Sequence, residues 1–371
     1  MDLPLGFLRI CMHIYRIRCY HIEMKPTVKK HLRNASILLG VLIVGGVGGW
    51  VIRDHFMSML LGQNSPAATL IRDSSSQYQY VDPLLLTGSG PKSTSLQFVD
   101  LSQKIQSYIA STSPDMNSSD VSVYYQDLNT GSWTGVNENG LYDPASMLKV
   151  TVLMAYLKEA QTDPSVFDQT YVYSGNDNDI EYFKPTEPLV QGQSYTVRDL
   201  LIAMIDQSDN VALRILQDNI PNSYISDVFD SLKLPLPPTD TATTSDYMSP
   251  KAVSRMFRVL YNGTYLYPEN ANQALSLLSQ TTFDNGISAP IASTTEVAHK
   301  FGERTLKDPT TDATINLELH DCGIVYYPDS PYLLCVMTKG QDYPSLEKII
   351  QGISSIVYIE EPNIAKSLET K

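Results

Sequence analysis

The sequence has little of what several common classes of protein depend on. Its 371 residues include four cysteines, too few for a disulfide-stapled scaffold, and contain no Walker loop, dinucleotide-binding glycine fingerprint or His-Glu-x-x-His metal motif. Only two histidines, His299 and His320, follow residue 95, so a Ser-His-Asp triad is a poor model, and we expect both to pack or to hydrogen-bond. The sequence therefore predicts no cofactor and no bound metal.

Basic charge is scarce outside the N-terminal arm. The net charge is −13, but residues 1–34 carry seven basic side chains against two acidic ones, which leaves −18 on the rest of the chain. Phosphate binding needs a basic footprint, so this acidic remainder argues against nucleic acid as a partner.

One long run lacks charge altogether. Residues 35–52 read ASILLGVLIVGGVGGWVI and lie between Arg33 and Arg53. The run is long enough to cross a bilayer, and no small-residue cleavage site follows it, although a cleaved signal and a buried core helix are alternatives. The basic residues before the run predict a cytoplasmic N-terminus, a single-pass anchor in the cell membrane and an extracytoplasmic remainder. Met24 is an alternative start of the chain.

These patterns divide the chain into four segments. They are a basic cytoplasmic arm at 1–34, the anchor at 35–52, a turn-rich linker at 53–95 and a globular domain at 96–371. Within the linker, we expect Tyr80 to Leu86 to dock on the globular domain.

Apolar periodicity predicts the elements of that domain. Leu96, Val99, Ile105 and Ile109 give 96–110 helical spacing. We expect strands at 121–128, 132–136 and 296–303, a hairpin over 322–338, and helices from residues 146, 200, 211, 251 and 346. Thr196 and Asp199 predict a capping box for the second of these helices. The order predicts an α+β fold, with an antiparallel sheet flanked by helices and an all-helical subdomain.

Cys322 and Cys335 lie in the two arms of the predicted hairpin. The turn between them is Pro328–Asp329–Ser330–Pro331. Two buried thiols are the simpler interpretation, and a cross-strand disulfide is the alternative.

Ser146 and Lys149 open the most apolar of the predicted helices. Positions i and i+3 share one helical face, so the hydroxyl and the amine can meet at its N-terminal end. A desolvated lysine there can lose its charge and act as a base for the serine. Because the helix is apolar nearly all round, we expect it to be buried between layers.

Two further motifs follow Ser146-x-x-Lys149 in order. Ser208–Asp209–Asn210 begins 62 residues after Ser146, and Lys300–Phe301–Gly302 begins 92 residues after Ser208. With these three motifs at these distances, residues 96–360 resemble the catalytic domain of class A β-lactamases and penicillin-binding proteins.

The resemblance implies a role for each motif residue. Ser146 would form an acyl-enzyme, Lys149 would accept or relay its proton, and Ser208 would pass a proton to the leaving nitrogen. Asn210 would hold the substrate amide, and Lys300, Phe301 and Gly302 would line the substrate groove, with Lys300 attracting a carboxylate. The main-chain N–H groups of Ser146 and Glu303 would form the oxyanion hole. Asp209 would fix the loop.

The chain departs from the family pattern at two places. No glutamate occurs between Glu187 and Glu269, the interval in which class A enzymes carry the base that activates the deacylating water. Asp240 marks the neck of a shortened loop there, and Asp227 or Asp230 are the nearest candidate substitutes. At the other place, Phe301 stands where the family has a hydroxyl near the substrate carboxylate.

The sequence thus predicts a membrane-anchored serine hydrolase that acts on β-lactams or related amide and peptide substrates. A penicillin-binding peptidase or esterase of the D-Ala-D-Ala type is one alternative. The other is a module that binds β-lactams or cell-wall fragments as a sensor without turning them over.

Overall fold

The computed structural model describes residues 70–73, 77–87, 96–112, 118–175, 182–236, 246–308 and 310–369. The predicted arm and anchor, 1–34 and 35–52, lie outside these residues. Within the described ranges, no helix is both long enough and apolar enough to cross a membrane.

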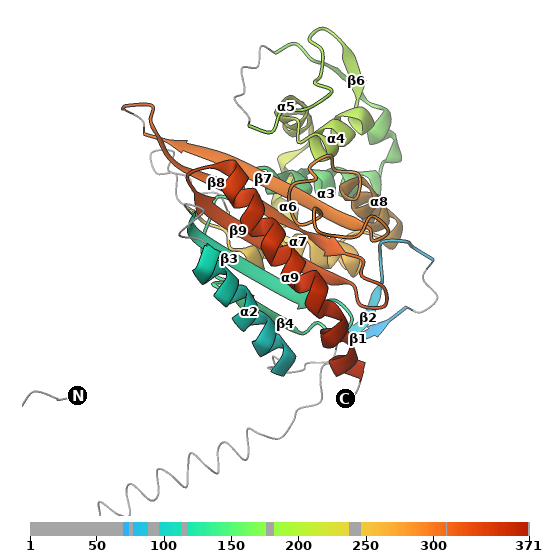
Figure 1. Cartoon of the computed structure of the whole chain (residues 1–371). Coiled ribbons are helices and arrows are strands. Elements are labelled where there is room, and N and C mark those ends of the chain that lie inside the picture. Colours follow the sequence, from blue (N-terminus) through green and yellow to red (C-terminus); the bar gives the residue numbers. More distant parts are fainter. Residues whose placement is uncertain are drawn as a thin grey trace, which may run out of the picture. The chain divides into compact units, whose positions relative to one another are not determined.

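A five-stranded antiparallel sheet forms the centre of the domain (Figure 1). Its strands run in the order β4-β3-β9-β8-β7, so the lysine-bearing strand lies at one edge. The bounds are β3 Ser118–Asp127, β4 Trp133–Val136, β7 Val297–Lys307, β8 Thr314–Val325 and β9 Tyr332–Gly340. The apolar runs of β8 and β9 are long because both strands are covered on both faces.

Two long helices cover one face of the sheet: α2, Leu96–Thr112, and α9, Tyr343–Glu369 (Figure 1). The first confirms the helix predicted over 96–110, but not all of the apolar residues that give it helical spacing face the sheet. Leu96 and Val99 are exposed, whereas Phe98, Leu101 and Ile105 are buried. The buried set keeps the i, i+3, i+7 spacing of a helix that packs on one surface. The side of α2 that faces the sheet is therefore the one that carries Phe98, and Leu96 and Val99 lie outside it.

The other face of the sheet is covered by helices that continue into the helical subdomain (Figure 1). Their core is α3, Lys149–Ala160, whose apolar side chains are buried nearly all round, as expected. The remaining helices are α4 Val197–Asp206, α5 Asn210–Asn219, α6 Asn222–Leu232, α7 Pro250–Tyr261 and α8 Pro268–Leu278, with short strands β5 Thr170–Val172 and β6 Ser194–Thr196 and a 3₁₀ turn, Pro164–Asp168.

Part of the predicted linker belongs to the folded domain. Strands β1, Leu70–Arg72, and β2, Leu84–Thr87, pair with each other. The main-chain N–H of Asp82 donates to the carbonyl of Tyr261 at 2.9 Å, and Arg72 pairs with Asp82 at 3.2 Å. Tyr80 is buried, and its N–H donates to Asn272 at 2.9 Å. The segment therefore docks against the ends of α7 and α8.

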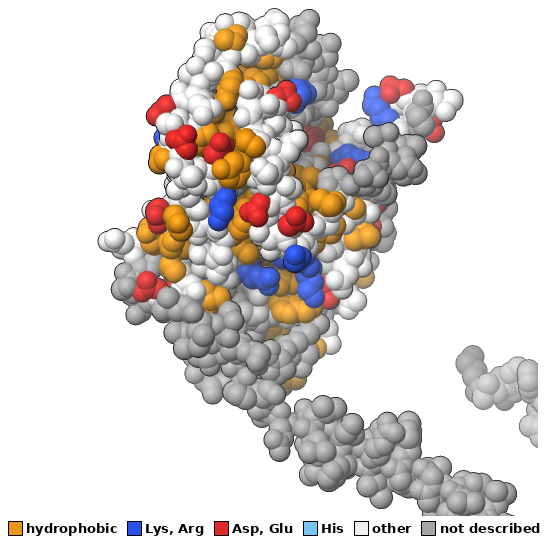
Figure 2. All heavy atoms as spheres, turned by 180° about the vertical axis from the view of Figure 1, so that it is seen from behind, with side chains coloured by type: hydrophobic (Ala, Val, Ile, Leu, Met, Phe, Trp, Pro, Cys, Tyr) orange, Lys and Arg blue, Asp and Glu red, His pale blue; other side chains and the backbone are white. Residues whose placement is uncertain are grey.

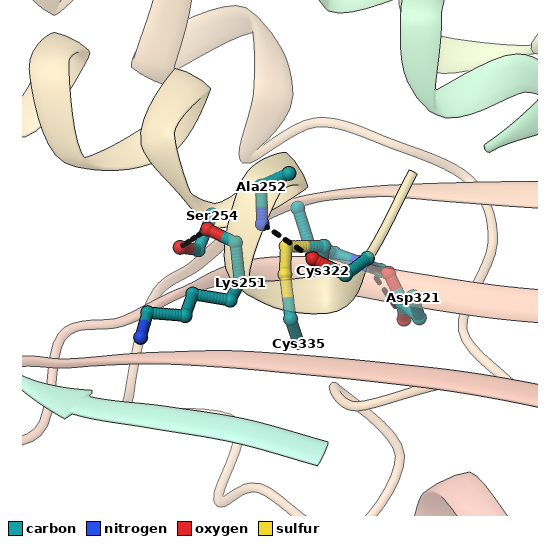
Figure 3. The surroundings of a disulfide bond; sticks show 8 residues. Lys251, Ala252, Ser254, Asp321, Cys322 and Cys335 are labelled. Carbon is teal, nitrogen blue, oxygen red and sulfur yellow. Dashed lines mark hydrogen bonds and ion pairs between the residues drawn. A yellow bond between two sulfur atoms is a disulfide. The ribbon is translucent and has the colours of Figure 1, made fainter. Parts of the chain in front are cut away.

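A disulfide joins the neighbouring strands β8 and β9 at Cys322 and Cys335, which face each other in the β8–β9 register. The cross-strand alternative is therefore the one that the structure contains. Figure 3 shows the bond beneath the first turn of α7, at Ala252. In the same row, Lys300 of β7 pairs with Cys322, so the bond adjoins the strand that carries the third motif.

The observed architecture confirms the α+β prediction, with an antiparallel sheet between helical layers. On the face drawn in Figure 2, acidic side chains are scattered among apolar ones, and the basic side chains occupy a few small areas. This distribution agrees with the acidic balance of the sequence outside its N-terminal arm.

Candidate active site

Ser146, the predicted nucleophile, lies on a 3₁₀ turn, Ala145–Leu148, and not on the α-helix that the sequence predicts from this residue. The α-helix begins only at Lys149. Ala145 enters the turn with a φ of 47°, a conformation that a residue with a β-carbon seldom adopts. In a 3₁₀ turn, side chains three residues apart lie directly above one another, so Ser146 and Lys149 still share one side.

The residue that leads into this turn is held from three directions. The Asp143 carboxylate accepts the N–H of Ala145 at 2.9 Å and pairs with Arg304 at 3.3 Å. Its carbonyl accepts a hydrogen bond from His320 Nε2 at 3.0 Å, and its own N–H donates to Glu318 at 3.2 Å. These contacts offset the strain at Ala145 and fix the place of Ser146.

Burial and charge oppose each other at Glu318. Burial works to raise the pKa of Glu318, but the hydrogen bond from His320 and the positive charges of Lys339 and Arg304 hold that pKa below its ordinary value. Glu318 therefore stays ionised behind the nucleophile turn.

Lys149 is buried, with 1% of its surface exposed, and its ammonium points at the second motif. The Nζ atom donates to the Ser208 carbonyl and lies 3.0 Å from Ser208 Oγ. The structure thus brings together two of the three predicted proton carriers. An ammonium with little water around it gives up its proton more readily than one in solution.

The loop that carries Ser208 is buried, and its backbone conformation and its cap on α5 allow this polar segment to be buried. Ser208 takes a left-handed φ of 55° between α4 and α5. The carboxylate of Asp209 accepts the N–H of Ala212 at 2.8 Å and so caps α5, the fixing role expected of it. Asn210 follows as the first residue of α5 and is half-buried.

Gly302 lets the edge of the sheet touch the nucleophile turn. A β-carbon at this position would lie 2.6 Å from the Pro144 carbonyl oxygen and 3.2 Å from the Met147 nitrogen. No side chain fits there, so glycine is required for β7 to run beside Ser146. Glu303 is the next residue of the strand, which places its main chain against the same turn.

Lys300 is fully buried on β7, and its Nζ lies 4.1 Å from the centre of the Phe301 ring. Phe301 is itself buried, stacks on Phe283 at 4.2 Å and meets the edge of Phe183 at 5.6 Å. Tyr343 of α9 joins the same aromatic cluster. The wall beside Lys300 is therefore apolar.

The side chain of Glu303 has a role that the sequence did not reveal. Its carboxylate accepts the main-chain N–H groups of Tyr182 at 3.2 Å and Phe183 at 3.0 Å. Burial raises the pKa of Glu303, while these hydrogen bonds and the nearby charge of Lys149 oppose the rise. Glu303 thus joins β7 to the segment between β5 and β6.

Asp206, the last residue of α4, is a second acid that sequence reasoning missed. Burial raises its pKa to about 7, and the charge of Lys300 acts to lower it. The sequence signal was only its place, two residues before Ser208, because no motif marks it.

A cavity of about 410 Å³ adjoins Lys149 on the side of the helical subdomain. Apolar side chains of the Ala145–Leu148 turn, of α5 and α6, and of Leu236 make up most of its wall. The polar positions are Lys149, Thr151, Gln217, Asn222 and Ser226. None of the described residues that line it is acidic. The described wall of this cavity therefore contains no carboxylate that could act as the deacylating base.

The proposed substitutes for that base do not face the cavity. Asp227 and Asp230 are exposed on α6, and the Asp227 carboxylate accepts the Tyr265 hydroxyl at 2.8 Å. Neither lines the cavity. Asp240 lies outside the described residues.

Both histidines are hydrogen-bonding residues, as expected. His299 Nδ1 lies 2.9 Å from Asp321, whose carboxylate also accepts the N–H of Ile287. His320 Nδ1 accepts the N–H of Thr338 at 3.1 Å, which leaves its Nε2 to donate to Asp143. Each ring thereby braces the strands around the site.

The fold and this arrangement of residues define a β-lactamase-type serine hydrolase. A model of the β-lactamase enzyme family matches residues 100–360, and the chain belongs to that family. No curated protein matches the sequence.

Solved structures with the same fold have little sequence in common with the chain. A class A β-lactamase from Mycobacterium abscessus is 20% identical, with 70% of this chain and 98% of that chain covered and a TM-score of 0.58. A β-lactamase from Sphaerobacter thermophilus is 17% identical, with coverage of 70% and 97% and a TM-score of 0.57. A leucine-to-glutamate mutant of PBP-A, solved as an acyl-enzyme complex with penicillin G, is 18% identical, with coverage of 74% and 97% and a TM-score of 0.54.

Proposed function

We propose that this protein forms an acyl-enzyme on Ser146 with β-lactams or related amide, peptide and ester substrates. The observation that carries the proposal is the buried Lys149, whose Nζ lies 3.0 Å from Ser208 Oγ and one 3₁₀ turn from Ser146. A serine beside a desolvated lysine and a second hydroxyl has both a base and a route for its proton.

The residues divide the acylation step among them. Lys149 takes the proton of Ser146 as its Oγ attacks the carbonyl carbon, and Ser208 passes a proton to the leaving nitrogen or oxygen. The main-chain N–H groups of Ser146 and Glu303 stabilise the oxyanion, a contribution of about 3–4 kcal/mol for each donor. Asn210 holds the substrate amide, and Lys300 supplies positive potential at the other end of the groove.

Release of the acyl group is the slow half of this reaction. The described wall of the cavity beside Lys149 contains no carboxylate to activate a water molecule. This favours long-lived acyl-enzymes, and therefore a penicillin-binding function over efficient antibiotic hydrolysis. The mutant of PBP-A that was solved as a penicillin G acyl-enzyme has the same fold.

Labelling with a fluorescent penicillin and with an activated neutral ester tests the proposal. We expect one or both to label wild type at Ser146, with a signal that persists for hours after a chase. Ser146→Ala should remove the label. Equal labelling of wild type and Ser146→Ala, or no labelling by either reagent, would refute the acyl-enzyme.

We further propose that residues 35–52 anchor the domain on the outer side of the cell membrane. The support is the uncharged run of eighteen residues and the basic residues before it. Protease treatment of intact cells should digest a tag at the C-terminus and spare one at the N-terminus. The reverse pattern would contradict the orientation.

A further inference from the structure

Lys300 is the cation that would attract a substrate carboxylate, and its side chain is fully buried. Its charge acts on Asp206 at the end of α4, but burial raises the pKa of Asp206 to about 7, so this carboxyl carries only part of a negative charge near neutral pH. The groups that oppose an anion beside Lys300 must therefore be others.

Glu303 adds a second carboxylate that cannot move away. It points to the same face of β7 as Phe301, because residues two apart on a strand share a face. The N–H groups of Tyr182 and Phe183 hold both of its oxygens, at 3.2 and 3.0 Å. Because these hydrogen bonds hold the carboxylate in place, it cannot move away from an anion to reduce the repulsion.

Phe301 stands where the family has a hydroxyl, a donor that would stabilise a substrate carboxylate against the charge of Glu303. Its ring is packed between Phe283 and Phe183, at centroid distances of 4.2 and 5.6 Å, and offers no hydroxyl to a carboxylate. Desolvating a charge against this apolar wall is unfavourable. Together these features oppose an anionic group where the Lys300 ammonium borders the ring, 4.1 Å from its centre.

We propose that the preferred substrates carry no carboxylate beside the scissile bond and are neutral esters or amides, because Glu303 adds a fixed negative charge and Phe301 offers an apolar wall without a hydroxyl. The inference rests on the acyl-enzyme function proposed above. In the step concerned, a bond forms between Ser146 Oγ and the carbonyl carbon, and the bond to the leaving oxygen or nitrogen breaks. The serine proton ends on the leaving group.

Penicillin G and its methyl ester make a matched pair, since they differ only in whether the carboxylate is free. The second-order rate of adduct formation on the full chain, followed by intact mass, gives the ester-to-acid ratio. We expect the ester to acylate wild type about tenfold faster or more, and added salt to narrow the gap by screening.

Glu303→Gln tests the residue itself, because glutamine removes the charge and keeps the size of the side chain and one acceptor oxygen for the Tyr182 or the Phe183 N–H group. The ester-to-acid ratio should fall by about tenfold. Glu296→Gln, an exposed position directly before β7, removes a carboxylate elsewhere and should leave the ratio unchanged.

The outcomes separate the two proposals. A wild-type protein that reacts with the free acid as fast as with the ester, or a ratio that Glu303→Gln does not change, overturns the substrate preference and leaves the acyl-enzyme intact. No adduct with either compound or with an activated neutral ester overturns the acyl-enzyme and the preference with it.

Discussion

Gly302 and Pro144 approach so closely that a β-carbon at residue 302 would lie 2.6 Å from the Pro144 carbonyl oxygen. The contact ties the outer strand of the sheet to the turn that carries Ser146. Gly302→Ala must push these two segments apart. We expect the acylation rate of Ser146 to fall by about 100-fold, because a shift of about 1 Å in reacting groups has that effect.

Gly263→Ala is the matched control for that variant. Its φ of 58° makes alanine unfavourable by about 1–2 kcal/mol, while a β-carbon there has room beside Val81 and Pro268. This variant should lose stability and keep the acylation rate of the folded protein. If Gly302→Ala reacts as fast as Gly263→Ala, the contact does not position Ser146.

Lys149→Ala should slow acylation by about 10²–10⁴-fold, the usual contribution of a general base. Lys149 is the buried lysine of α3, whereas Lys158, one turn from the other end of the helix, donates to the Tyr265 carbonyl near the surface. Lys158→Ala should therefore react at the wild-type rate. Stopped-flow measurement with an activated ester would compare them, and equal rates for the two variants would exclude Lys149 as the base.

Release of a penicillin label should not depend on the acids of α6. Asp227 and Asp230 are exposed and do not line the cavity beside Lys149. In a chase, Asp227→Asn and Asp230→Asn should keep the wild-type half-life of the acyl-enzyme. A half-life lengthened by about tenfold in either variant would identify the base that the described wall of the cavity lacks.

Glu361 predicts how stability varies with pH. It is fully buried, accepts the hydroxyls of Tyr125 at 2.8 Å and Ser330 at 2.6 Å, and burial raises its pKa to about 7. The folded protein keeps a proton that the unfolded chain loses above its ordinary pKa of 4.5. The free energy of unfolding therefore falls as the pH rises from about 4.5 to 7.

Glu361→Gln stays neutral and should escape this fall. Measured by urea unfolding, the free energy of unfolding of the variant should rise relative to that of wild type between pH 5 and pH 8, by at most about 3 kcal/mol. Asp206, whose pKa burial raises to about 7, adds a fall of the same sign to both proteins. Glu360→Gln, which removes a carboxylate that pairs with Lys104 near the surface, should show no such widening. A constant gap for Glu361→Gln would contradict the prediction.

The disulfide between Cys322 and Cys335 should contribute to stability. It closes a loop with a sequence separation of 13 residues, which corresponds to about 3 kcal/mol in the chain-entropy account. Cys335→Ser should lower the unfolding free energy by about that amount. Peptide mapping without reductant should recover the two cysteines in one linked fragment, and separate fragments would refute the bond.

Much of the fold could be predicted from local patterns. The capping box of Thr196 and Asp199, the strand that carries Lys300 and the buried helix after Lys149 all appear near the expected positions. Each rests on near-neighbour chemistry or on hydrophobic periodicity, which the sequence contains directly.

What the sequence could not supply came from contacts between distant segments. The 3₁₀ turn at Ser146 depends on Asp143, which Arg304 and His320 hold from the sheet. The main-chain contact of Tyr182 with Glu303 spans 121 residues. Leu96 and Val99 are exposed because the other side of α2 meets the sheet. Periodicity predicts a helix with an apolar face, but it does not say which of the apolar residues are buried.

The position of β7 at the edge of the sheet affects how such a site can evolve by substitution. The proposed nucleophile, Ser146, lies on the 3₁₀ turn that leads into α3, and Lys149 begins that buried helix, where most substitutions disturb packing. Phe301 and Glu303, in contrast, lie on a strand with a neighbour on one side only. A substitution at Glu303 can shift the range of compounds accepted while the acyl-forming side chains stay as they are, so substrate range and reaction chemistry can evolve separately.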